Sequence, residues 1–307
     1  DGNLWIGTET SLLKLENEGN LIAIQPVDFP NFSECVRVLR FDQSGNLWIG
    51  TNRGLFLYHP STNQARKIDL NPSSQNEVVQ EIISNEDGTI WIGTYSSGIF
   101  EVNQITHDTR NIIIDPSNIR SNNVRAISIS PDGKYWIGTW GGLYFYDRKN
   151  GVTAKYFHDD RDPKSLVSNS ISCILRDSKG NIWLGTRLGL NMLIEVRINI
   201  LAYKSIPGEN RFLSNGEIYA LMEDQKGDIW IGTESGGINI LNRKSGFFRY
   251  LVSNKNSANS ISGNCIKAFL DDGKNNIWIG TYPDGLDIYN LQTGTFKHFK
   301  NDPANPN

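Results

Sequence analysis

The four residues Trp48-Ile49-Gly50-Thr51 are repeated almost unchanged along the whole chain. Six further copies begin at Trp5, Trp91, Trp136, Trp183, Trp230 and Trp278, and the copy at Trp183 has Leu in place of Ile. Successive copies lie 43, 43, 45, 47, 47 and 48 residues apart, and they contain every one of the eight tryptophans except Trp140. Self-similarity at such a period is typical of repeat architectures.

Each copy of this motif lies in a unit whose composition predicts four short strands. In the unit around Trp136, apolar and β-branched segments occupy residues 124–129, 135–139, 143–146 and 152–157. The turn 131–133 (Pro-Asp-Gly) separates two of them, and the longer polar stretch 158–169 leads to the next unit. Short strands joined by tight turns predict a four-stranded antiparallel sheet. The glycine of the motif is expected to allow close approach of a neighbouring backbone.

Repeated radially, such sheets predict an all-β, seven-bladed β-propeller that forms a single domain over residues 1–307. The expected blades cover about residues 1–32, 33–75, 76–120, 121–166, 167–213, 214–261 and 262–307. The first blade begins at its second strand and the last ends after its fourth, so one inner strand is missing. We expect that strand to come from residues before position 1 or after position 307, with the polar tail 301–307 as a loop leading to it.

The composition argues against some classes of function. Lys and Arg number 30 and Asp and Glu 33, which gives a net charge of −3 and disfavours a general nucleic-acid or membrane-surface binder. No apolar run approaches the ~20 residues of a membrane span, and no signal peptide is recognisable. The chain opens in the middle of a repeat, which indicates a piece of a longer protein.

No catalytic or metal-binding motif is recognisable. The four histidines show neither an HExxH nor another paired metal spacing, and no Gly-x-Ser-x-Gly elbow or P-loop occurs. Cys35, Cys173 and Cys265 fall in strand-like apolar segments without CxxC spacing, which favours a role as buried small hydrophobes. We therefore expect no catalytic residue, no metal and no cofactor.

The residues that flank the motif recur with it. Asn169-Ser-Ile-Ser-Cys-Ile174 precedes Asp177-Ser-Lys-Gly-Asn-Ile-Trp-Leu-Gly-Thr186, and Asn122-Asn-Val-Arg-Ala-Ile127 occupies the same place one unit earlier. This pattern resembles the two-component regulator propeller repeat, and the resemblance covers essentially the whole chain.

The resemblance implies the periplasmic sensor region of a hybrid two-component histidine kinase anchored in the inner membrane. Proteins of this family carry two seven-bladed propellers, an immunoglobulin-like domain, one transmembrane helix and an intracellular kinase, and in glycan-degrading bacteria they detect oligosaccharides. The implied partners are an oligosaccharide, the neighbouring propeller and immunoglobulin-like domain of the same chain, and a second copy in a full-length homodimer. No nucleic acid is expected to bind this region, and kinase activity is expected only in domains outside it.

Two sets of variable positions are expected on the loop-bearing face of the propeller, and variable loops on a rigid scaffold commonly carry function. The positions that follow the motif Thr include Arg53, Tyr95, Trp140, Arg187, Glu234 and Tyr282. The second positions of the inner strands, near the mouth of the central channel, include Arg37, Gln80, Arg125, Tyr219 and Lys267.

Aromatic side chains among these positions indicate a sugar ligand. Tyr95, Trp140 and Tyr282 offer flat apolar faces on which a sugar ring can stack. Trp140 is the most informative of them, because the scaffold does not require an aromatic residue there. Its alternative role is to cap the interface between two blades.

Cationic side chains at the same face favour a ligand with negative charge. Arginine forks bind carboxylate and sulfate groups well, so a uronic-acid or sulfated oligosaccharide fits these positions. The alternative is a rim in which the cations are ion-paired with Glu9, Glu81 and Glu234.

Three hypotheses about function follow. The first is a non-catalytic sensor that detects an oligosaccharide or relays its binding to a histidine kinase. The second is a glycan lyase or hydrolase, because blades can bring distant carboxylates together. The third is a purely structural propeller that dimerises or packs on its neighbour.

Overall fold

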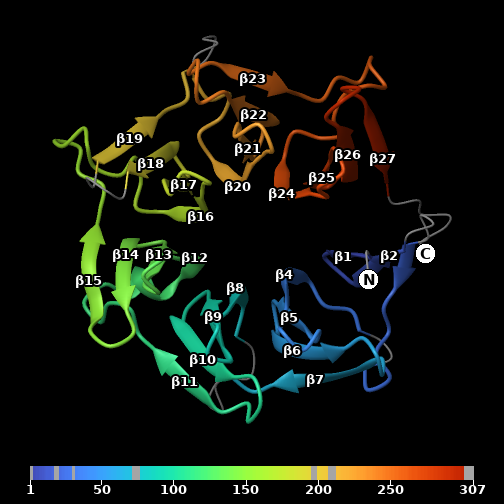
Figure 1. Cartoon of the computed structure of the whole chain (residues 1–307), viewed down its shortest axis with the longest axis vertical. Coiled ribbons are helices and arrows are strands. Elements are labelled where there is room, and N and C mark those ends of the chain that lie inside the picture. Colours follow the sequence, from blue (N-terminus) through green and yellow to red (C-terminus); the bar gives the residue numbers. More distant parts are fainter. Residues whose placement is uncertain are drawn as a thin grey trace. The chain divides into compact units, whose positions relative to one another are not determined.

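The computed structural model describes residues 3–16, 21–29, 32–70, 77–194, 199–206 and 212–300. In this part of the chain the fold is an all-β, seven-bladed β-propeller, as the sequence predicts. The first blade is a three-stranded sheet, and each of the other six is a four-stranded antiparallel sheet (Figure 1). Among the described residues, the first blade has no counterpart of the strand that precedes the motif strand in the other blades, as the sequence predicts. The tail 301–307 lies outside the described residues.

Two compact units divide the chain, unit 1 up to Thr153 and unit 2 from Ala154. The first four blades consist of β1 (Leu4–Gly7), β2 (Leu12–Leu15) and β3 (Leu21–Ala23); β4 (Val36–Phe41), β5 (Leu47–Thr51), β6 (Gly54–His59) and β7 (Gln64–Ile68); β8 (Val79–Ser84), β9 (Thr89–Thr94), β10 (Ile99–Asn103) and β11 (Thr109–Ile112); and β12 (Val124–Ile129), β13 (Tyr135–Thr139), β14 (Gly142–Asp147) and β15 (Gly151–Tyr156). That all seven blades form one domain stays a prediction from the repeat.

The last three blades belong to unit 2. They consist of β16 (Ile171–Arg176), β17 (Ile182–Thr186), β18 (Leu190–Ile194) and β19 (Asn199–Tyr203); β20 (Ile218–Glu223), β21 (Ile229–Thr233), β22 (Ile238–Leu241) and β23 (Phe248–Leu251); and β24 (Ile266–Asp271), β25 (Asn276–Thr281), β26 (Gly285–Asn290) and β27 (Phe296–Phe299). Within each unit the first strands of adjacent blades contact each other, β4 with β8, β8 with β12, β16 with β20 and β20 with β24.

The strands of the unit around Trp136 agree with those expected from its sequence to within one residue at each end. β14 begins one residue earlier and ends one residue later, and β15 begins and ends one residue earlier. One short 3-10 helix, η1 (Ile119–Asn122), was not expected. Its cap, Asn118, accepts a hydrogen bond from the N–H of Arg120. In the described ranges no helix has the length and hydropathy needed to cross a membrane.

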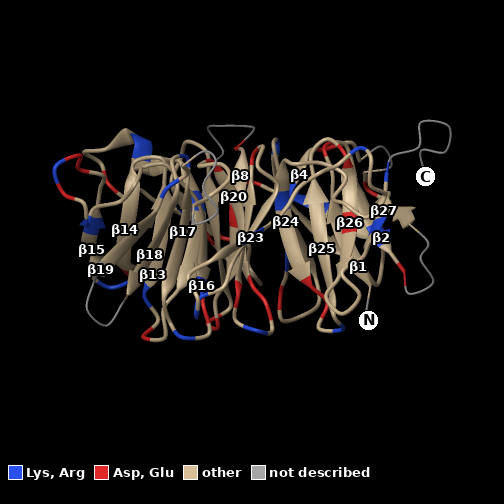
Figure 2. Cartoon of the chain, turned by 90° about the horizontal axis from the view of Figure 1, so that it is seen from above, with Lys and Arg blue, Asp and Glu red and all other residues tan. Residues whose placement is uncertain are grey.

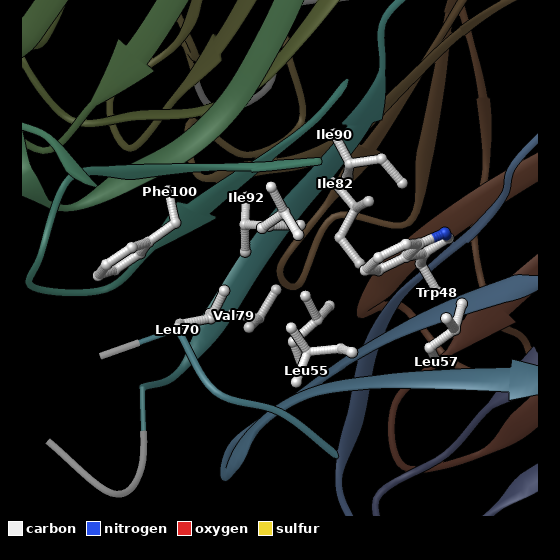
Figure 3. Close-up of a cluster of buried hydrophobic side chains, with 11 residues drawn as sticks. Trp48, Leu55, Leu57, Leu70, Val79, Ile82, Ile90, Ile92 and Phe100 are labelled. Atoms are coloured by element: carbon white, nitrogen blue, oxygen red, sulfur yellow. The ribbon is translucent and has the colours of Figure 1, made fainter. Parts of the chain in front are cut away.

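The motif strands pack blade against blade. Trp48 and Leu55 of the second blade meet Val79, Ile82 and Ile92 of the third blade in one buried cluster (Figure 3). Trp48 is 0% exposed. Large aromatic side chains dominate the energetics of such cores, so Trp48 stabilises the scaffold and is not available to a ligand.

An Asp in the turn before the motif binds both the turn backbone and the motif Trp in three blades. Asp42, Asp177 and Asp224 each accept a hydrogen bond from the indole N–H of the Trp six residues later, at 2.8–3.0 Å. The same carboxylates accept main-chain N–H groups two and four residues further on. An indole donor buried without an acceptor costs roughly 1–3 kcal/mol. One Asp therefore shapes the turn and also satisfies the buried Trp.

The motif glycine is required by side-chain packing. A Cβ atom at Gly50 would lie 2.5 Å from Cγ1 of Val38 and 2.5 Å from Cγ1 of Val79, which belongs to the next blade. At Gly280, by contrast, the nearest atom is Cβ of Ala268, at 3.6 Å. The expectation of a close backbone is therefore corrected for Gly50, where the close neighbours are β-branched side chains.

Charged residues lie mainly in turns, loops and strand ends, with both signs mixed (Figure 2). No group of three or more His, Cys, Asp or Glu is arranged to hold a metal in the part of the chain that the structure describes. None of the three cysteines forms a disulfide, and all three are partly buried. Cys35 and Cys265 precede β4 and β24, so the expectation that they lie buried inside strands was wrong.

Candidate functional site

The loop after each motif has the same backbone anchor in all seven blades. The hydroxyl of Thr51 donates to the carbonyl of Gly54 at 3.0 Å, and that of Thr94 donates to Gly98 at 2.9 Å. The same bond, to a carbonyl three or four residues later, is made by Thr8, Thr139, Thr186, Thr233 and Thr281. Local side chain–backbone bonds of this kind set turn geometry. The Thr therefore fixes the loop whatever residue follows it.

The residue after the Thr is held from a second direction. The main-chain N–H of Tyr95 donates to the carbonyl of Val78 at 3.0 Å, and that of Trp140 donates to Asn123 at 3.1 Å. Equivalent bonds hold Asn52, Glu234 and Tyr282. Each acceptor immediately precedes a first strand, so these candidate positions share a fixed backbone next to the strand starts.

In unit 1, Arg37 is held by two neutral amides. Its Nη1 donates to Oδ1 of Asn52 at 3.1 Å, and its Nη2 donates to Oε1 of Gln80 at 3.0 Å. Arg53 instead lies 3.6 Å from Glu34. The structure thus brings together Arg37 and Gln80, two of the residues singled out from the sequence, and gives Arg53 an acidic partner.

The aromatic candidates of unit 1 form a pair. The ring centroids of Tyr95 and Trp140 are 6.0 Å apart with an interplanar angle of 59°. Tyr95 is 45% exposed and Trp140 is partly buried, so the pair offers apolar surface to solvent and also bridges two blades. Arg125, at the second position of β12, is partly buried. The buried side-chain oxygen of the adjacent Asn123 has no hydrogen-bond partner among the described residues.

In unit 2 the candidates form a denser cluster around an acid. Nε of Arg187 lies 3.5 Å from Oε1 of Glu217, and the hydroxyl of Tyr219 donates to the same oxygen at 3.3 Å. Nζ of Lys267 lies 3.6 Å from the ring centroid of Tyr219 and 5.7 Å from that of Tyr282. Cations over aromatic faces are attracted by the ring quadrupole. Glu217, which was not predicted, therefore joins Arg187 to Tyr219, and Lys267 connects Tyr219 to Tyr282.

Electrostatics keep the phenol of Tyr219 protonated. Burial, and then the charges of Glu217 and Glu234, raise the pKa of Tyr219 to about 12. The hydroxyl therefore remains a donor to Glu217 over the physiological pH range.

The ion-paired rim considered from the sequence is present with different acids. The observed partners of Arg53 and Arg187 are Glu34 and Glu217, whereas Glu9, Glu81 and Glu234 were expected. Glu34 lies two residues before the start of β4, and Glu217 lies one residue before the start of β20. Acidic residues just ahead of a first strand are the sequence signal that would have identified them.

Glu81 is unusual among the third positions of the first strands. That position faces the motif glycine and is otherwise small or apolar, as in Val38 and Ala126 of unit 1. Burial raises the pKa of Glu81 to about 7, although a main-chain bond from Ile82 and the charge of Arg40 oppose the shift. Glu81 therefore takes up a proton near neutral pH in the folded protein.

We expect Glu81→Gln to stabilise the protein at pH 8 by about 2 kcal/mol and to change little at pH 4. The folded pKa of Glu81, about 7, lies above its usual value of 4.5. The folded state therefore binds more protons than the unfolded state between those values, and the stability of the wild-type protein falls as pH rises through that window.

Denaturant unfolding of both proteins from pH 4 to pH 8 measures this difference. Glu86→Gln, at an exposed turn position, serves as the control with the same chemical change. Equal stability of wild-type and Glu81→Gln proteins at pH 8 would contradict the prediction.

Comparison with protein families finds the same repeat in four places. The model described as "Two component regulator propeller" matches residues 118–141, 165–187, 213–235 and 260–282. Each match runs from the segment before a first strand to the end of the motif or just beyond it. The chain thus carries two-component regulator propeller repeats, as its sequence indicated. A search of curated protein sequences gives no match.

Solved structures with a similar fold include extracellular sensor regions. The extracellular domain of the putative hybrid two component system BT3049 from B. thetaiotaomicron matches with a TM-score of 0.77 and 26% identity, over 95% of this chain and 38% of that one. The extracellular domain of BT4673 from the same organism matches with a TM-score of 0.54 and 19% identity, over 97% of this chain and 53% of that one. This chain therefore spans less than two thirds of either domain.

An enzyme shares the fold at lower identity. A catalytically inactive virginiamycin B lyase from Staphylococcus aureus matches with a TM-score of 0.55 and 13% identity, over 83% of both chains. At that identity the likeness concerns the fold alone.

Proposed function

We propose that this chain is the extracellular sensor propeller of a hybrid two-component signalling protein, held in the periplasm as part of an inner-membrane protein. The observation that carries the proposal is the 26% identity to the extracellular domain of BT3049 over 95% of this chain. The four two-component regulator propeller matches support it independently. In this role the propeller either binds the ligand itself or relays the binding of a ligand elsewhere. In both cases the signal passes to a histidine kinase in another part of the protein.

The ligand class we propose is an oligosaccharide. The exposed part of Tyr95, the adjacent Trp140 and the exposed Tyr282 supply aromatic surface of the kind on which sugar rings stack. They stand at positions whose backbone is already fixed, which lowers the entropic cost of binding. The arginines and the lysine at these positions favour an acidic oligosaccharide on sequence grounds. Arg53 and Arg187, however, already pair with acidic side chains.

The proposed partners within the protein are the neighbouring propeller, the immunoglobulin-like domain and a second copy of the sensor. Two alternatives remain, a glycan lyase or hydrolase and a purely structural propeller. The sensor is favoured over the enzyme because the likeness to BT3049 includes sequence identity of 26%, whereas the likeness to the lyase is 13% identical and concerns the fold.

Calorimetric titration with a panel of neutral and acidic oligosaccharides tests the proposal. We expect at least one member to bind the wild-type protein, and Trp140→Ala or Arg125→Ala to weaken that binding about tenfold or more, since hot-spot aromatic and arginine residues commonly contribute at least 2 kcal/mol. Ile105→Ala, at a side chain that is 86% exposed in the β10–β11 loop, is the control.

Failure of every oligosaccharide to bind would remove the sensor's proposed ligand class. Turnover of an oligosaccharide in the same experiment would favour the lyase or hydrolase instead. Full binding by both Trp140→Ala and Arg125→Ala would place the ligand away from this face.

A further inference from the structure

Glu217 lies at the centre of the charged cluster of unit 2. Its carboxylate pairs with Arg187 and accepts the hydroxyl of Tyr219, while its main-chain carbonyl accepts the N–H of Glu234 at 2.9 Å. Its side chain is 24% exposed, whereas that of Arg187 is 57% exposed. The acid is thus the fixed component, and Arg187 presents its exposed part to solvent beside it.

The net charge of this cluster is close to zero. Arg187 and Lys267 contribute two formal positive charges, and Glu217 and Glu234 contribute two formal negative charges. Tyr219 is neutral, because burial and then the charges of Glu217 and Glu234 raise its pKa to about 12. The balanced formal charge of this cluster agrees with the ion-paired alternative considered from the sequence and differs from a locally basic mouth.

The same groups suit a neutral ligand that carries hydroxyls. An arginine beside a carboxylate presents donors and acceptors side by side, and a hydroxyl can use both. The 48% exposed ring of Tyr282 adds aromatic surface, whereas Lys267 covers one face of the ring of Tyr219. An anionic group would instead meet the charges of Glu217 and Glu234, and it would have to draw Arg187 away from its partner. Repulsive groups of this kind are how sites reject a related ligand.

We infer that Glu217 determines the charge selectivity of the unit 2 cluster, so that the cluster accepts neutral hydroxylated rings and rejects acidic ones. The inference rests on the proposed function, which supplies the ligand class. It adds the residue that distinguishes neutral from acidic oligosaccharides. Glu217 acts in part through Arg187 and Tyr219, and is in that sense a positioning residue.

A matched pair of small glycosides tests the inference. Methyl β-D-glucopyranoside and methyl β-D-glucuronide differ only in a hydroxymethyl group that is replaced by a carboxylate. Titrations followed by NMR should show the neutral glycoside binding the wild-type protein about tenfold or more tightly than the acidic one. In Glu217→Gln the affinity for the glucuronide should rise about tenfold, because Arg187 loses its charged partner.

Two further measurements separate charge selectivity from a general loss of structure. The alkaline titration of Tyr219 should shift to lower pH in Glu217→Gln, because one of the charges that raise its pKa is gone. Asp160→Asn makes the same change of charge at a side chain in unit 2 that is 95% exposed, and it should leave the ratio of the two affinities unchanged.

The inference is overturned if the glucuronide binds the wild-type protein as tightly as the glucoside, if neither binds, or if Glu217→Gln leaves the ratio unchanged. Binding of an acidic oligosaccharide from the panel with no effect of Glu217→Gln would leave the proposed sensor intact and remove this inference alone. A panel without any binding would remove the proposed ligand class as well.

Discussion

Replacing Arg243 by Ala is expected to lower the free energy of unfolding by about 3–5 kcal/mol, because the change leaves buried acids without their cation. Arg243 follows β22, and its side chain is 10% exposed. It donates to Asp177 of the preceding blade at 2.5 Å, to Glu223 of its own blade, and from Nε to the carbonyl of Gly227 at 2.6 Å. The side chain of Asp177 is 0% exposed.

The effect is large because Asp177 cannot simply return to solvent. Burial alone would raise the pKa of Asp177, but hydrogen bonds from Asn181 and Trp183 and the charge of Arg243 hold it below the usual range. Without Arg243, a carboxylate that also anchors the buried indole of Trp183 is left uncompensated.

Denaturant unfolding of the wild-type and Arg243→Ala proteins measures this loss. Arg161→Ala is the matched control, because the Arg161 side chain is 91% exposed and pairs with Asp159 at the surface. Surface pairs of this kind contribute about 0–1 kcal/mol. A loss below about 1 kcal/mol for Arg243→Ala would show that water replaces the arginine readily, and the account of a buried inter-blade clamp would fail.

The second large effect is expected at Gly50. Gly50→Ala should destabilise the protein by about 3 kcal/mol, because the new methyl group would overlap two valine side chains at 2.5 Å. Val38 and Val79 are β-branched and stiff, so they cannot rotate away at low cost. The positions lie in the sheet and in the contact between two blades, so relief would require the backbone to move.

The same substitution at the same motif position provides the control. Gly280→Ala should change stability by less than about 1 kcal/mol, because the added methyl group meets Cβ of Ala268 at an ordinary 3.6 Å. Thermal or denaturant unfolding of the two variants decides between packing and backbone conformation as the reason for the glycine. Equal losses at both positions would show that the motif requires glycine for its backbone.

The repeat allowed the fold to be predicted from the sequence. Seven tryptophans at a nearly constant spacing, each with its own turn, predict seven sheets, and the strands around Trp136 were placed almost to the residue. The incomplete first blade could be predicted for the same reason, because a missing member is visible against six complete ones. The helix η1 was not predicted, because the strand pattern was sought only in the apolar segments and η1 lies in the polar start of the repeat match at 118–141.

The candidate site could be predicted only in part from the sequence. The periodic pattern identified Arg187, Tyr219 and Lys267 as positions worth examining, but it gave no means of pairing them. The link between Arg187 and Tyr219 runs through Glu217, which stands one position before β20 and reaches a residue of the preceding blade. Contacts between different repeats are set by three-dimensional packing, and the charge of the cluster follows from them. The sequence therefore indicated the cations, whereas the structure shows which acids pair with Arg53 and Arg187.

The bond from each motif Thr to its own loop has a consequence for how such a surface changes over evolutionary time. Because the hydroxyl and the next main-chain N–H carry the geometry, the side chain of the following residue is not needed to hold the loop. Side-chain substitutions at the five positions that have both bonds are therefore expected to leave the architecture intact. These positions are Asn52, Tyr95, Trp140, Glu234 and Tyr282. One ancestral repeat could in this way diversify into sensors for many different molecules, and randomised libraries confined to these positions should yield folded proteins at high frequency.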